Sequence, residues 1–291
     1  MMPEHPRSTP TPRGGPARPG TWAAWLLSLA CAGAQAHDTW FELRTSPGPA
    51  ALWLGTGDRF PVLEARVEWP HLQRHGCAPQ AELSTRGAAA GRPLVAVTGP
   101  AGRLAQALAL RLPSAAAAAE GAPPVPHSCW ASLVPFDIEI EPARVEVYLQ
   151  EIAASAALRA AWAAEQAAGR PWRERYVKHA RIELGGTSPV AVGMGLEAVI
   201  VGPTQPRAGQ ELRLQLLWAG RPLGDHPVEF VNAGSRLGIW RRTDAQGQVA
   251  LALPEAGRWM ARSTLLRPPA RPGERWLSDF VTLTFSGFPP R

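Results

Sequence analysis

Residues 212–218 read Leu212-Arg213-Leu214-Gln215-Leu216-Leu217-Trp218. Apolar and polar side chains alternate through most of this stretch, which is typical of a strand that buries one face. Turn sequences follow at residues 219–223 and 243–247, and the second has Asp and Gly where a type I turn prefers them. Further strands are expected at residues 228–231, 249–253, 257–262 and 279–285. About seven short strands in roughly 95 residues predict an immunoglobulin-like or prealbumin-like β-sandwich domain over residues 193–291.

A second series of short β segments fills residues 37–150. Gly, Pro and polar residues separate the segments, as expected for strands joined by turns. The candidates are residues 39–43, 51–54, 64–69, 94–97, 104–112, 131–139 and 145–149. This spacing predicts an N-terminal β-sandwich domain.

The periodicity changes between the two β-rich regions. Residues 151–168 lack Pro and Gly, and Leu158 and Trp162 are spaced to share one face of a helix that ends at Gly169. A second short helix is expected to begin at Pro171 and run to His179, because Pro is favoured in the first turn of a helix. Residues 151–192 are therefore predicted as a helical insert with a connecting strand. The expected fold class is mainly β, with two β-sandwich domains and this short insert between them.

The first 36 residues have the layout of a secretory signal peptide. An apolar run extends from Trp22 to Ala34, and Ala34-Gln35-Ala36 forms an A-x-A cleavage site. The run has about 13 residues, whereas a membrane-spanning helix needs roughly 20. We expect cleavage after Ala36 and export to the periplasm, with an uncleaved signal anchor as the alternative.

Cleavage after Ala36 would make His37 the first residue of the mature chain. An N-terminal histidine offers two nitrogen ligands, the imidazole and an α-amine whose ordinary pKa is about 8. His37 is therefore a candidate metal ligand, although a histidine can also follow a cleavage site by chance. A distant imidazole must complete such a site, and His179 is the prediction for it. Alternatively, His179 is a residue of a helix C-terminus that interacts with the helix dipole.

Two cysteines, Cys77 and Cys129, remain in the mature chain. An even pair in an oxidising compartment favours a structural disulfide. The alternative is a Cys2His2 metal site, because His75 and His127 each stand two residues before a cysteine.

The net charge of the chain is +6, and Lys178 is the single lysine among its 30 basic side chains. The arginines are scattered and form no stripe with aromatic residues, so nucleic-acid binding is not expected. The chain contains no G-x-S-x-G, H-E-x-x-H or P-loop motif, and an enzyme is not expected.

Several segments, in this order, carry a family resemblance. They are the Ala36-His37-Asp38-x-Trp40 start, Gly57–Pro61, Arg173–His179, Arg221-Pro222-Leu223, Thr243-Asp244-x-x-Gly247 and Gly257-Arg258-Trp259. The chain resembles the exported DUF4198 family, once labelled a nickel-uptake (NikM-like) component. The resemblance implies a periplasmic protein linked to transition-metal uptake, with a C-terminal immunoglobulin-like domain.

These observations lead to three hypotheses. The first is a non-enzymatic protein that binds Ni, Co or Cu and assists its uptake or delivery, with a membrane transporter or outer-membrane receptor as a further partner. The second is a β-sandwich interaction module for such a transporter or receptor, in which the histidines are incidental. The third is a copper-dependent oxidative enzyme, since an N-terminal histidine on a β-sandwich resembles the copper brace of oxidative polysaccharide-cleaving enzymes. That brace requires a second histidine.

Overall fold

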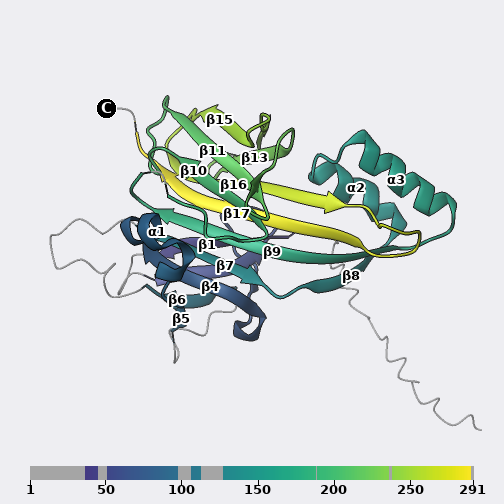
Figure 1. The fold of residues 1–291 in the computed structure, drawn as a ribbon, viewed down its shortest axis with the longest axis horizontal. Coiled ribbons are helices and arrows are strands. Elements are labelled where there is room, and N and C mark those ends of the chain that lie inside the picture. Colours follow the sequence, from purple (N-terminus) through teal and green to yellow (C-terminus); the bar gives the residue numbers. More distant parts are fainter. Residues whose placement is uncertain are drawn as a thin grey trace, which may run out of the picture. The chain divides into compact units, whose positions relative to one another are not determined.

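A computed structural model describes residues 37–44, 51–97, 106–112, 127–187, 189–235 and 238–289. The predicted signal peptide lies outside these ranges. β-strands dominate the described residues, and the largest of their three sheets has eight strands (Figure 1). Its strands follow the order β14 (Ile239–Arg242), β13 (Pro227–Asn232), β16 (Gly257–Arg267), β17 (Trp276–Gly287), β9 (Trp172–Leu184), β7 (His127–Leu133) and β4 (Leu72–Pro79), with β8 (Phe136–Ile140) paired to β9.

A four-stranded sheet packs against the β13, β16 and β17 part of the large sheet. It contains β10 (Leu196–Val201), β11 (Glu211–Trp218), β12 (Arg221–Pro222) and β15 (Gln248–Ala252). The leucines of β11 that alternate in the sequence, Leu212, Leu214 and Leu216, are buried in the core between the two layers. The alternation of β11 thus predicted its buried face correctly.

A five-stranded sheet packs against the β4, β7 and β9 part of the large sheet. It contains β1 (Asp38–Arg44), β2 (Ala51–Gly57), β3 (Ala65–Arg66), β5 (Val95–Ala96) and β6 (Leu108–Arg111). Its core includes Phe41 and Leu54 together with Ile182 of β9. The fold class predicted from the sequence, mainly β and built from packed sheets, is confirmed.

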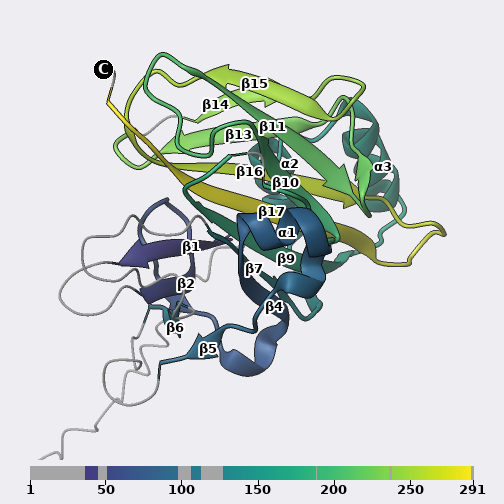
Figure 2. The same cartoon turned by 60° about the vertical axis from the view of Figure 1, so that its left-hand side comes forward.

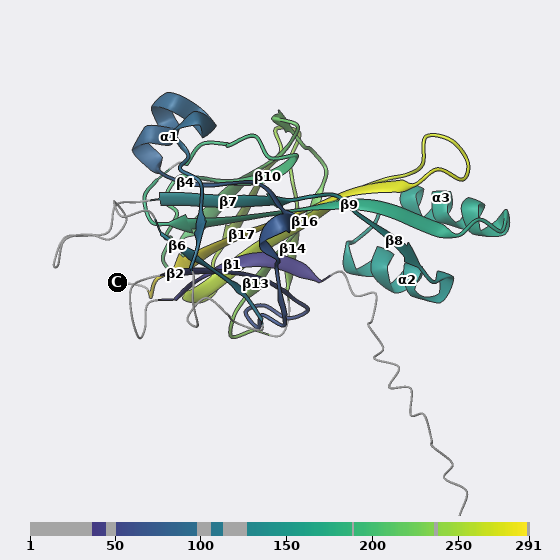
Figure 3. The same ribbon diagram turned by 90° about the horizontal axis from the view of Figure 1, so that it is seen from below.

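The two smaller sheets cover opposite faces of the large sheet. In the parallel β9–β17 ladder, Ile182 lies beside Thr284 and Arg181 lies beside Leu283. Ile182 belongs to the core of the five-stranded sheet and Leu283 to the core of the four-stranded sheet. Because neighbouring residues of a strand point to opposite faces, the two cores lie on opposite sides of β9 and β17. Figure 3 agrees, with β1 and β10 on different sides of β9.

Residues 34–291 form one compact unit. The large sheet takes strands from both predicted sandwich domains, 37–150 and 193–291. Figure 2 shows β4 and β7 on one side of β9 and β16 and β17 on the other. The division into two sandwich domains with an insert at 151–192 remains a prediction.

Helices cover one end of the large sheet. They are α2 (Pro142–Glu151) and α3 (Ala156–Ala167), which pack through Tyr148 and Trp162 onto the aromatic residues of β9 and β17. The helix expected at 151–168 is present as α3, although it begins five residues later, after Ser155, whose side chain caps it. The strand expected at 145–149 is wrong, because Val145, Tyr148 and Leu149 are spaced to bury one helical face.

The second short helix, expected from Pro171 to His179, is also wrong. This segment is the first part of β9, in which buried Trp172 and Glu174 alternate with exposed Arg173 and Arg175. The period is two, and hydrogen bonds to β8 and β17 satisfy the backbone on both edges.

The remaining short elements surround β4. They are the 3-10 turns Trp69–His71 and Gly87–Ala90 and the helix α1 (Gln80–Arg86). Within the described part of the chain, no helix is both long and apolar enough to cross a membrane.

Candidate metal centre at His37

His37 immediately precedes β1, and the β1–β2 pairing places it beside the end of β2. Asp38 lies opposite Gly57 in this antiparallel ladder, so Asp58 is the next residue beyond the pair. The chain then turns, with Val62 N donating to Arg59 O at 2.7 Å, and returns to β2 through Glu64 N, which donates to Thr56 O at 2.9 Å. The turn therefore places Asp58 and Glu64 on the same side as His37.

Three ligand-bearing side chains meet at this position. His37 Nδ1 lies 2.8 Å from Asp58 Oδ1, and one Glu64 carboxylate oxygen lies within 4.8 Å of both groups. Glu64 Oε2 also accepts a hydrogen bond of 3.2 Å from the Asp58 backbone N–H. The exposed fractions of the His37 and Asp58 side chains are 37% and 35%, so solvent reaches the cluster. An imidazole with two carboxylates is a donor set that suits a divalent transition metal.

Charged groups of the large sheet lie directly beneath the cluster. Arg262 of β16 pairs with both Asp38 and Glu229, and these carboxylates raise the pKa of Arg262. Lys178 Nζ of β9 donates to the backbone oxygen of His37 at 2.5 Å. Burial lowers the Lys178 pKa to about 8, although Asp38 and Asp58 act in the opposite direction. Asp38 is thus engaged by an arginine and is separate from the three candidate ligands.

A cavity of about 140 Å³ adjoins this cluster. Its charged lining consists of the carboxylates of Asp38, Asp58 and Glu151 and the guanidinium of Arg262. The predominance of carboxylates favours cations over anions in this space.

The structure does not bring His179 to His37. Lys178 faces the His37 backbone, and the next residue of a strand points to the opposite face, where His179 lies. There His179 is buried, with Nδ1 2.8 Å from Ser132 Oγ and Nε2 3.3 Å from Asp279 Oδ1. The predicted pairing of His37 with His179 is therefore not formed. In the described ranges the His37 cluster contains no second histidine of the kind that a copper brace requires.

Cys77 and Cys129 form a disulfide, which confirms the structural prediction. The two residues lie directly opposite each other on β4 and β7, and both are fully buried. Their sulfur atoms are bonded to each other, so the alternative Cys2His2 site is not formed.

Sequence reasoning missed Asp58 and Glu64 as candidate ligands. Asp58 belongs to the Gly57–Pro61 segment that contributes to the family resemblance, and this was the available signal. Nothing in the sequence around Glu64 indicates a metal ligand, because only the folded turn brings Glu64 close to His37.

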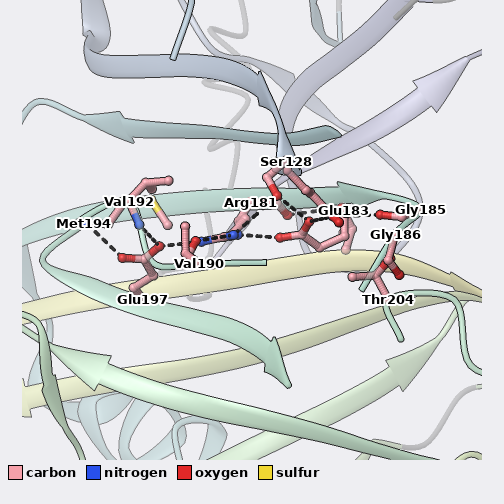
Figure 4. Close-up of polar contacts among 12 residues, drawn as sticks. Ser128, Arg181, Glu183, Gly185, Gly186, Val190, Val192, Met194, Glu197 and Thr204 are labelled. Atoms are coloured by element: carbon pink, nitrogen blue, oxygen red, sulfur yellow. Dashed lines mark hydrogen bonds and ion pairs between the residues drawn. The ribbon is translucent and has the colours of Figure 1, made fainter. Parts of the chain in front are cut away.

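A second group of charges is buried on the face of β9 opposite to Lys178, and Figure 4 shows its polar contacts. Arg181 is fully buried between two carboxylates, with Nε 2.6 Å from Glu183 Oε1 and Nη1 2.5 Å from Glu197 Oε1. Glu197 also accepts backbone N–H bonds from Val192, Gly193 and Met194, at 2.8 to 3.2 Å. Arg181 neutralises the carboxylates and the backbone donors engage Glu197, so this group joins β9 to the loop before β10.

Fold and site together define a mainly β protein with a solvent-accessible histidine–carboxylate cluster at its predicted mature N-terminus. Residues 135–265 match the family model described as "Domain of unknown function (DUF4198)". The resemblance to the DUF4198 family is thus confirmed over this segment, which runs from β8 to β16. No curated protein and no solved structure matches the chain.

Proposed function

We propose that the protein, once cut after Ala36, binds one divalent transition-metal ion through His37, Asp58 and Glu64. The proposal depends on one observation: three ligand atoms converge within 4.8 Å beside the residue that would become the N-terminus. The imidazole atom that faces Asp58 is Nδ1. This is the ring nitrogen nearer to the backbone, so it can close a chelate ring with the α-amine of the same residue.

The resulting donor set would be two nitrogens from His37 and two carboxylate oxygens. Imidazole and amine nitrogens favour Ni, Co and Cu, and carboxylates complete the coordination of each of these ions. A chelating residue also loses less entropy on binding than two separate ligands do, because its second donor is already in place.

The proposed role is uptake or delivery of the ion in the periplasm. The predicted signal peptide and the family resemblance support this location and role. The partial exposure of His37 and Asp58 also suits an ion that is exchanged, since sites that hold a structural ion are closed to solvent. A membrane transporter or an outer-membrane receptor is the proposed recipient.

The test compares two proteins that differ by one residue. The mature form begins with His37, and the matched form keeps Ala36, which converts the α-amine into an amide. Intact mass establishes the first residue of each, and calorimetric titration with Ni(II), Co(II) and Cu(II) gives the affinity. We expect the mature form to bind at least one of these ions, and the extended form to bind it at least 10-fold more weakly, as a lost chelate donor would require.

Side-chain variants then identify the oxygen ligands. Asp58→Asn and Glu64→Gln should each weaken binding by about 10-fold. Asp225→Asn removes a carboxylate that pairs with Arg242 elsewhere on the surface and serves as the matched control. Equal affinities of the mature, extended and Asp58→Asn proteins would contradict the proposed site.

A further inference from the structure

Lys178 is the only lysine in a chain whose other basic side chains are all arginines. We propose that Lys178 is the positioning residue of the N-terminal site and holds His37 in the orientation that allows it to chelate the ion. This inference rests on the proposed function, because it assigns a role within the same site.

The contact is specific and links distant parts of the chain. Lys178 Nζ reaches the backbone oxygen of His37 across 141 residues of sequence. The Lys178 side chain is half-buried, and its ammonium also lies 5.5 Å from the centre of the Tyr176 ring. A hydrogen bond from a charged donor is stronger than one between neutral groups, and this one is partly shielded from water.

The chemistry of the site explains why a lysine stands here. An ammonium is a compact point charge with three donors, whereas a guanidinium is a wide planar fork. Lys178 donates from its Nζ to a single carbonyl oxygen, that of His37.

Fixing the carbonyl of His37 restricts the rest of the residue. The first residue of a chain has no preceding peptide group, so its amine and side chain can rotate unless other contacts hold them. The Lys178 bond holds the carbonyl on one side, and the Asp58 contact holds Nδ1 on the other. A ligand that is already oriented binds more tightly, because less freedom is lost when the ion arrives.

The test uses the mature protein that begins with His37 and three variants of it. Lys178→Met keeps an unbranched apolar stem that is one atom shorter and removes the donor, and Lys178→Arg keeps a cationic donor. Thr282→Val is the matched control, because Thr282 Oγ1 donates at 2.6 Å to the backbone oxygen of Thr39 and so anchors β1 two residues further along. Calorimetry gives the affinity for Cu(II) and Ni(II), and the Cu(II) electron paramagnetic resonance spectrum reports the nitrogen and oxygen donors.

We expect Lys178→Met to weaken binding by 10- to 100-fold, as is usual for a partner that orients a metal ligand. Its Cu(II) spectrum should change from one species to a mixture, Lys178→Arg should recover part of the affinity, and Thr282→Val should stay within about threefold of the unaltered protein. Tighter binding by Lys178→Met would show that the ammonium only repels the ion and would overturn the inference. An unchanged affinity and spectrum would also overturn it. If the unaltered mature protein binds no ion, the proposed function itself fails, and this outcome is distinct from both others.

Discussion

The Cys77–Cys129 disulfide connects an edge strand, β4, to the rest of the large sheet, and its removal has a calculable cost. The two cysteines are 52 residues apart in the sequence. Closing a loop of this length lowers the conformational entropy of the unfolded chain and corresponds to about 4 kcal/mol at 25 °C. We therefore expect the Cys77→Ala/Cys129→Ala protein to lose about 4 kcal/mol of unfolding free energy.

The position of the disulfide indicates where the loss should appear first. β4 is the last strand in the sheet order and pairs with β7 along its length. Both cysteines belong to the core beneath the five-stranded sheet, so two alanines also leave part of that core unfilled. In the double alanine variant, the backbone amides of β4 should therefore exchange with solvent hydrogen faster than those of β9, which is paired on both edges.

Urea unfolding followed by tryptophan fluorescence measures the effect. Three samples are compared: the oxidised protein, the same protein with a reductant, and the double alanine variant. The reduced protein and the double variant should both unfold at lower urea concentrations, because both lack the cross-link. The double variant should unfold at the lowest concentration, because its alanines also leave part of the core unfilled. If the oxidised and reduced proteins unfold at the same concentration, the cross-link does not restrict the unfolded chain and the reasoning is refuted.

Three further predictions concern stability. Glu197→Ala leaves the buried Arg181 with one carboxylate fewer and should cost about 3–5 kcal/mol of unfolding free energy in chemical unfolding. Glu197→Gln keeps the shape and removes only the charge, so a Glu197→Gln protein as stable as the unaltered protein would argue against a role for the charge. Burial raises the Glu174 pKa, so the folded state holds the Glu174 proton more tightly than the unfolded state does, and the unfolding free energy should fall as the pH rises above 4.5, the ordinary value. Measured from about pH 4 to 8, the unfolding free energy of Glu174→Gln should lack this fall. Identical pH dependence of the variant and the unaltered protein would contradict the prediction. Gly247→Ala should cost more than about 1 kcal/mol, because φ is +70° and a Cβ would stand 2.6 Å from a backbone oxygen. Gly220 has a φ of +75° but open space around it, so thermal unfolding of Gly220→Ala should show a smaller loss, and equal losses would remove the role of the close contact.

The sequence predicted those strands whose two faces differ. In β11 one face is buried and the other contains Arg213 and exposed Glu211, so the period of two is visible in the sequence. The disulfide was also predictable, because the predicted signal peptide implies an oxidising compartment and leaves two cysteines that can pair. By contrast, the sharing of one sheet between two cores depends on the parallel pairing of β9 with β17, which joins residues about 100 positions apart. No local pattern encodes that pairing.

Prediction of the candidate metal site from the sequence failed for a similar reason, at a single residue. The cleavage motif was sufficient to single out His37, but its expected partner depended on assigning residues 171–179 to a helix. As the strand β9, the same segment directs Lys178 toward His37 and His179 away from it. The period of two therefore decides which of two adjacent residues contacts His37: Lys178 donates to its backbone oxygen, whereas the imidazole of His179 lies on the opposite face of the strand. The oxygen donors come from the turn after β2, whose position follows from the β1–β2 register, so the metal centre that we propose is specified by strand pairing and not by the spacing of histidines.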